Sequence, residues 1–109
     1  MTLTELPRTI VEAAAVLRRR EASSRELARL ALERVAADPY NAWLARADLR
    51  ALAQADAADR RLAAGDAPLL CGVPWACKDI IGTEGVETTA ASRILEGYLP
   101  PYSATVVLR

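Results

Sequence analysis

Lys78 is the residue in this sequence whose type and setting best suit catalysis. It follows the almost wholly apolar segment 69–77, a pattern typical of a buried strand. In a strand, Lys78 would share a face with small residues such as Gly72 and Ala76, where a ligand can come close. Burial there would disfavour the charged ammonium, and a neutral amine can act as a general base. Composition alone favours the alternative, a solvated lysine at the strand end paired with Asp79.

Other nucleophilic side chains near the lysine have simpler explanations. Thr88, Thr89 and Ser92 offer hydroxyls, but such a nucleophile needs a base, and turn or capping roles are far commoner for these residues in loops. Cys77 precedes Lys78 directly, and adjacent strand residues point to opposite faces. We therefore expect Cys77 to be a small buried apolar residue, and Lys78 to be the catalytic candidate.

Composition excludes several classes of site. The chain has no histidine, so it cannot by itself build a Ser-His-Asp or Cys-His site. Cys71 and Cys77 are the only soft metal ligands, so we expect neither a metal nor a cofactor in this chain. In an extended strand these two cysteines would lie roughly 20 Å apart, too far for a disulfide. Free thiols indicate a reducing compartment. Because the N-terminus shows no signal-peptide pattern and no apolar run reaches membrane-spanning length, we expect a cytoplasmic protein without a membrane partner.

The charge balance argues against a polyanionic partner. Lys and Arg together number 14, Asp and Glu also number 14, and the formal net charge is zero. No overall field attracts a nucleic acid, so we expect no direct contact with one. The basic run 18–20 ends a predicted helix, where cations complement the helix dipole. That role is commoner for such a run than phosphate binding.

Helical patterns dominate the chain up to Gly65. The sequence holds two capping boxes, Thr9 with Glu12 and Ser23 with Glu26. Each precedes apolar residues at helical spacing, and these predict helices over 9–20 and 24–37. A third helix is predicted to begin with Asp48 as its cap and to run to about Ala64, with Gly65 terminating it.

The second part of the sequence predicts strands and turns. Strands are expected over 40–45 and 69–77, the latter starting late or lying at an edge because Pro74 lacks a donor. Turns are expected at 65–68 and 82–85 and an extended stretch at 99–102. Ser103 is expected to cap a helix that starts at Ala104. That helix would be cut within its second turn at Arg109, so the sequence end is interpreted as a truncation.

Three segments resemble the amidase-signature family, in order along the chain. They are the G-V-P-x-x-x-K-D pattern over 72–79, the T-T-A-x-S pattern over 88–92 and the P-Y-x-A-T-V-V pattern over 101–107. The two opening helices and Asn41-Ala42-Trp43 are also similar to the family. Departures are Ala91 where glycine is usual, Ile80 where asparagine is common and Ser103 in place of an aspartate.

The resemblance implies an α/β fold, with opening helices followed by the first strands of a mixed sheet. Residues 1–109 would then form a single incomplete domain. Family enzymes use a serine nucleophile, a bridging serine on a cis peptide and a lysine. Only the lysine maps onto this sequence, at Lys78, and the Gly/Ser-rich segment with both serines would lie beyond Arg109. The resemblance therefore implies a fragment that is inactive alone.

Within the family, residues 92–98 followed by Pro-Pro-Tyr are most similar to the A subunit of aspartyl/glutamyl-tRNA amidotransferase. That resemblance implies a fragment of a glutamine amidohydrolase whose ammonia passes to partner subunits, one of which uses ATP. A fragment of a stand-alone amidase-signature hydrolase is the alternative enzyme. A non-catalytic remnant that binds other subunits is the alternative from a different class.

Overall fold

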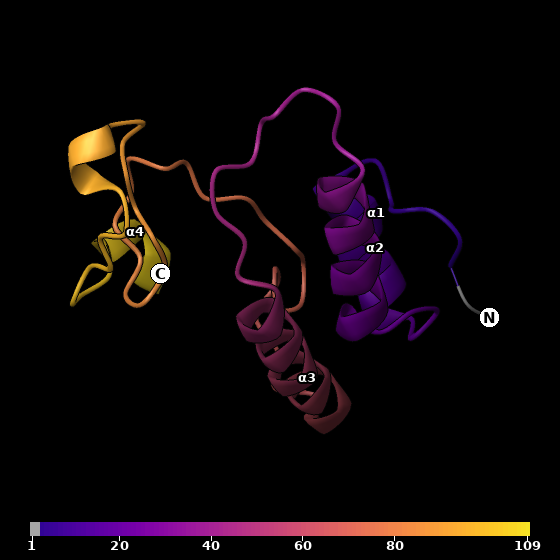
Figure 1. The fold of residues 1–109 in the computed structure, drawn as a ribbon. Coiled ribbons are helices and arrows are strands. Elements are labelled where there is room, and N and C mark those ends of the chain that lie inside the picture. The colour runs from indigo at the N-terminus through magenta and orange to yellow at the C-terminus, as the bar shows by residue number, and fades with distance from the viewer. Residues whose placement is uncertain (1–2) are drawn as a thin grey trace. The chain divides into compact units, whose positions relative to one another are not determined.

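The computed structural model describes residues 3–109, which divide into two compact units. The first unit holds the described residues up to Tyr40 together with Asp48–Trp75, and the second holds Asn41–Ala47 and Ala76–Arg109. The helices are α1 (Ile10–Arg18), α2 (Ser24–Ala36), α3 (Asp48–Ala64), the 3₁₀ helix η1 (Arg93–Leu95) and α4 (Thr105–Leu108), as Figure 1 shows. Over residues 3–109, the helices are too short or too polar to traverse a bilayer.

Both predicted capping boxes are confirmed, and they set the starts of α1 and α2. The Thr9 hydroxyl accepts from the Glu12 amide at 3.1 Å, and the Glu12 carboxylate accepts from the Thr9 amide at 3.2 Å. Ser23 and Glu26 exchange the same two bonds at 3.1 and 2.9 Å. Each box satisfies two of the amides that a helix start leaves without partners.

The remaining free amides of α2 are satisfied by the third helix. Asp59 accepts from the Ser24 amide at 2.7 Å and from the Arg25 amide at 3.1 Å, so every amide from Ser23 to Glu26 has a side-chain acceptor. A carboxylate at this position also complements the positive end of the helix dipole. Asp59 thus fixes α3 against the start of α2.

The third helix matches its predicted range, with one correction at its start. Asp48 was expected to cap the helix but is its first helical residue. Gly65 ends it as predicted, with φ +80° and an amide donating to Leu62 O at 3.3 Å. The basic run lies against the same helix end: Arg20 donates to Ala63 O at 3.2 Å, and Arg18 donates to Pro68 O at 3.1 Å. These arginines therefore satisfy backbone carbonyls.

The core of the first unit is small and lies where the helices meet. Its buried members are Ala13, Leu17 and Leu27, and four partly buried residues pack on them: Leu3, Leu6, Leu62 and Val73. Gly72 lies against this core at the start of α2, where its carbonyl accepts a hydrogen bond from the Ser24 hydroxyl at 2.8 Å. A Cβ on Gly72 would lie 3.1 Å from Ser24 Cβ and 3.2 Å from Leu17 Cδ1. Only glycine permits this approach.

The two predicted strands, 40–45 and 69–77, are wrong. Residues 3–109 contain no strand, so of the expected α/β architecture only the helical part is present in the described chain. Residues 69–72 form turns instead, with Cys71 N donating to Pro68 O at 3.0 Å and Val73 N donating to Leu70 O at 3.2 Å. Gly72 has φ +87°, outside the strand region. An apolar run becomes a strand only where a neighbour pairs with it.

The second unit is built from turns around a short bridge. Thr83 and Val86 form an antiparallel bridge, and Gly85 turns the chain between them at φ +73°, which confirms the predicted turn. Pro100 is buried, and its carbonyl accepts from the Gly85 amide at 3.2 Å. Ser103 does not cap α4 as predicted: its hydroxyl accepts from the Glu84 amide at 2.9 Å, while Ala104 occupies the cap.

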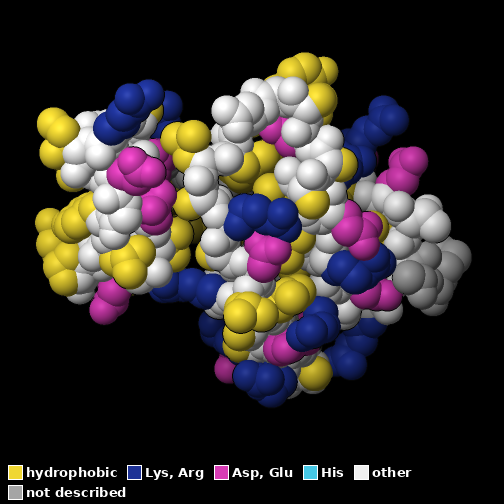
Figure 2. Space-filling model, viewed as in Figure 1, with side chains coloured by type: hydrophobic (Ala, Val, Ile, Leu, Met, Phe, Trp, Pro, Cys, Tyr) yellow, Lys and Arg dark blue, Asp and Glu magenta, His cyan; other side chains and the backbone are white. Residues whose placement is uncertain are grey.

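Much of the second unit's apolar surface is exposed. Figure 2 shows hydrophobic side chains over the part of the molecule that carries α4. The large exposed side chains of this unit are Trp43, Leu44, Ile80, Ile94, Leu95, Tyr98, Leu99, Tyr102, Val106 and Leu108. The unit is therefore held by backbone hydrogen bonds and side-chain caps more than by a buried core.

Candidate functional site

Lys78 lies at the end of residues 73–78, which have no regular secondary structure, and its side chain is exposed. Its carbonyl accepts from the Ile81 amide at 2.9 Å, which closes a turn over 78–81. The expected position on the buried face of a strand is therefore wrong for the described chain. Lys78 is also the only lysine among the 14 basic residues, the other 13 being arginines. Because arginine keeps its proton at working pH, no other basic side chain of this chain can replace Lys78 as a base.

The neighbouring Asp79 binds a second segment, ten to twelve residues further along the chain. Its Oδ1 accepts from the Thr89 amide at 3.0 Å, and its Oδ2 accepts from the Thr89 hydroxyl and from the Ala91 amide, the latter at 3.2 Å. Its backbone carbonyl accepts from the Ala90 amide at 3.0 Å. We call this set of four bonds the Asp79 clamp. The Thr89 hydroxyl and the Thr89 and Ala91 amides hold the pKa of the Asp79 carboxyl below its ordinary value of 3.8.

The clamped turn has an unusual backbone. Ala90 and Ala91 both have positive φ, at +49° and +58°, a region that favours glycine. Each left-handed alanine costs roughly 1–2 kcal/mol relative to a right-handed one. The departure noted from the sequence, Ala91 at a position where the family usually has glycine, falls on one of these two residues.

The hydroxyl groups near Lys78 have the structural roles that the sequence favours. The Thr88 hydroxyl donates to Val86 O at 3.1 Å, and the Ser92 hydroxyl accepts from the Ile94 amide at 3.3 Å, capping η1. Thr89 is buried in the Asp79 clamp. Each hydroxyl is engaged in a local turn or cap, so the geometry favours none of them as a nucleophile.

The predicted burial of Cys77 is wrong, because its side chain is exposed. Its Sγ lies 3.8 Å from Thr83 Oγ1 and 3.9 Å from Ile81 O, which are long, weak contacts. The strand that would have buried Cys77 does not form in the described residues. Cys71 and Cys77 are both free thiols.

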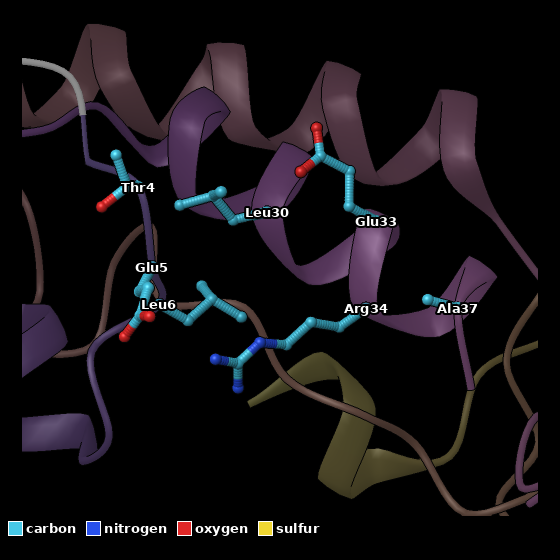
Figure 3. Close-up of a pocket in the computed structure, with 7 residues that line it drawn as sticks. All are labelled: Thr4, Glu5, Leu6, Leu30, Glu33, Arg34 and Ala37. Atoms are coloured by element: carbon cyan, nitrogen blue, oxygen red, sulfur yellow. The ribbon is translucent and has the colours of Figure 1, made fainter. Parts of the chain in front are cut away.

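A pocket in the first unit lies between the N-terminal segment and α2 (Figure 3). It is lined by Thr4, Glu5, Leu6, Leu30, Glu33, Arg34 and Ala37, and Figure 3 shows Arg34 extending toward the segment of Glu5 and Leu6. None of the residues singled out from the sequence lines it. Within residues 3–109, no three His, Cys, Asp or Glu side chains gather as metal ligands would.

The sequence profile of the amidase family matches residues 26–109, which include Lys78, Asp79 and the clamped turn. The chain belongs to the amidase family. Three relatives within it are named as the A subunit of glutamyl-tRNA(Gln) amidotransferase. The chain is 53% identical to the one from Myxococcus xanthus, with 98% of this chain and 22% of the relative covered. It is 52% identical to the one from Pelobacter propionicus, over 89% and 20%, and 48% identical to the one from Saccharophagus degradans, over 91% and 21%.

The chain spans about a fifth of the length of these amidase relatives. The family resemblance drawn from its three motifs is thereby confirmed, as is its similarity to the amidotransferase A subunit. What the sequence reasoning missed is the Asp79 clamp. Asp79 and Thr89 fall in two separate motifs, and only the folded chain shows that they bind each other.

Proposed function

We propose that this chain is the opening part of a glutamine-hydrolysing subunit of a tRNA-dependent amidotransferase. The observation that carries this proposal is the identity of 48–53% over about nine-tenths of the chain to proteins named as the A subunit of glutamyl-tRNA(Gln) amidotransferase. In such an assembly, ammonia released from glutamine passes to partner subunits that amidate an acyl-tRNA with ATP. The substrate of this chain's own site is then a small primary amide.

The role proposed for Lys78 is that of general base. A neutral Lys78 amine would accept the proton of the bridging serine, which in turn takes the proton of the nucleophilic serine. The serine oxygen then bonds to the amide carbon of glutamine, and the proton held by Lys78 returns through the bridging serine to the amide nitrogen, so that the C–N bond breaks and ammonia leaves. Water afterwards hydrolyses the acyl-enzyme to give glutamate. Lys78 is exposed in the described chain, so this role requires further groups to cover and desolvate its amine.

A chimeric subunit tests the proposal. In it, residues 1–109 replace the matching segment of the Myxococcus xanthus relative, and the partner subunits of that organism are added. We expect the chimeric subunit to release ammonia from glutamine and to support amidation of glutamyl-tRNA(Gln). The unaltered Myxococcus protein is the positive control. Residues 1–109 alone should release no ammonia, because general-base help without its nucleophile gives no covalent catalysis.

Two outcomes would contradict the proposal. One is a chimeric subunit that folds, as judged by circular dichroism, binds its partners and yet hydrolyses no glutamine. The other is a chimeric subunit that hydrolyses simple amides but supports no amidation of the tRNA, which would favour the stand-alone amidase.

A further inference from the structure

The Asp79 clamp joins the residue next to the only lysine to three consecutive residues of another turn. The bonds involve the Thr89 amide, the Thr89 hydroxyl, the Ala90 amide and the Ala91 amide. Asp79 contributes both its carboxylate and its backbone carbonyl. The main chain at Asp79 is therefore fixed directly, and not only through a flexible side chain.

The clamp stabilises a conformation that the sequence does not favour. Ala90 and Ala91 take left-handed φ values in succession, and such residues persist only where surrounding bonds over-determine them. Strained backbone of this kind concentrates at sites where geometry matters for function. The amides of Ala90 and Ala91 both donate to Asp79, so the same hydrogen bonds that form the clamp also stabilise the strained backbone.

Asp79 itself is poorly suited to chemistry. Its carboxylate already accepts three hydrogen bonds, and these hold its pKa below the ordinary value, so it is ionised at neutral pH and a weak base. Thr89, which supplies two of the bonds, is buried. A group bound in this way orients its neighbours.

We propose that Asp79 is a positioning residue for Lys78, and that the Thr89 hydroxyl is the donor through which it acts. The clamp carries the lysine on a segment anchored to the turn 89–91, so the amine is presented from one fixed backbone position. This inference rests on the proposed function, in which Lys78 is the base. The clamp reduces the motion that would otherwise take the amine out of reach of its proton donor.

The test uses near-isosteric variants of the chimeric subunit. Asp79→Asn alters the carboxylate and Thr89→Val removes the hydroxyl donor, so each weakens the side-chain part of the clamp, while Thr89→Ser keeps the hydroxyl and is the matched control. We expect Asp79→Asn and Thr89→Val each to lower kcat for glutamine hydrolysis by about 10–100-fold with little change in KM, the scale of loss from a misplaced catalytic group. Thr89→Ser should stay close to wild type. The Asp79→Asn/Thr89→Val double variant should lower kcat no further than the more damaging single variant, because both substitutions affect the same interaction.

A second arm separates positioning from a general structural role. Asp79→Asn is added to Lys78→Ala, where there is no lysine left to position, and the residual rate is measured. Positioning predicts no further loss in that background. Three results would overturn the inference. One is a further loss of rate when Asp79→Asn is added to Lys78→Ala. The others are a Thr89→Ser variant as slow as Thr89→Val, and an unchanged kcat in both Asp79→Asn and Thr89→Val. If Lys78→Ala alone retains near-wild-type kcat, Lys78 is not the base. That result contradicts the proposed function itself, and the positioning role of Asp79 fails with it. Urea titrations show whether each variant is folded. If Asp79→Asn is unfolded, Thr89→Val is used in its place in both arms of the test.

Discussion

Gly72→Ala is the substitution whose cost can be worked out most fully from the structure. Gly72 has φ +87°, and its added Cβ would meet Ser24 Cβ and Ser24 Oγ at 3.1 Å and Leu17 Cδ1 at 3.2 Å. Leu17 and Ser24 are both buried, so neither side chain can move into solvent. The matched control is Gly65→Ala, because Gly65 has a similar φ of +80° with nothing within 4 Å of the added Cβ.

The two substitutions share a backbone term and differ in a packing term. A non-glycine residue with left-handed φ costs roughly 1–2 kcal/mol. The loss of glycine's freedom in the unfolded chain offsets about 0.4–1 kcal/mol of that cost. Gly65→Ala should therefore destabilise by about 1 kcal/mol. Overpacking adds typically 1–3 kcal/mol at Gly72, which brings Gly72→Ala to about 2–4 kcal/mol.

Urea unfolding followed by far-UV circular dichroism measures both free energies. The shared φ term cancels in the difference, which should be about 1–3 kcal/mol and reports the contact with Leu17 and Ser24. A domain of this size has a total stability of about 5–15 kcal/mol, so Gly72→Ala should unfold a visible fraction if the parent lies at the low end. Equal midpoints for the two variants would refute the packing deduced for Gly72.

Three further predictions follow from single features. Ala91→Gly should raise the free energy of unfolding by up to about 1 kcal/mol, because relief of a left-handed alanine exceeds glycine's entropic cost; an unchanged or lower urea midpoint would contradict this. Asp59→Ala should cost about 0.5–2 kcal/mol by leaving the Ser24 and Arg25 amides uncapped, and unaltered thermal stability would argue against that role. The depressed pKa of Asp79 means that the stabilisation from the ionised clamp is present above pH 3.8 and is lost as pH falls through the lower folded value. An NMR titration of the Asp79 carboxyl should give a midpoint below 3.8, and one at or above it would be a contradiction.

The helices could be predicted from the sequence because their signals are local. Thr9 and Ser23 each find the partner that completes a capping box three residues away, and Gly65 ends α3 by its own φ. Chemistry within one turn of chain does not depend on what lies elsewhere.

The errors concern features that depend on distant partners. Residues 69–77 have a strand's composition, but strand formation needs a neighbour to accept the ladder bonds, and residues 3–109 provide none. The burial expected for Cys77 and Lys78 depended on that same strand. Ser103 has the side chain of a cap, yet its hydroxyl binds the Glu84 amide, nineteen residues away.

The two parts of the candidate site differ in how far the sequence indicates them, and the catalytic role of Lys78 stays a prediction. Lys78 stood out by its residue type after an apolar run, and the motif around it led to the family. The Asp79 clamp could not be predicted, because the bond between Asp79 and Thr89 depends on how two turns are brought together. The strain at Ala90 and Ala91 was equally hidden, since alanine gives no local signal of a positive φ.

The turnover of Lys78→Ala in the chimeric subunit is the most direct test of the central claim, that this chain supplies the base of an amide-hydrolysing site. Lys78 is the only lysine in residues 1–109, so the substitution leaves no other lysine side chain in this segment. Loss of a general base typically lowers the rate by about 10²–10⁴-fold, and more where the group works as part of a unit. We predict a loss of kcat for glutamine hydrolysis of at least that size, with folding preserved by circular dichroism and no rescue by Lys78→Arg. A Lys78→Ala variant that keeps more than about a tenth of the wild-type kcat would contradict the assignment of Lys78 as the base.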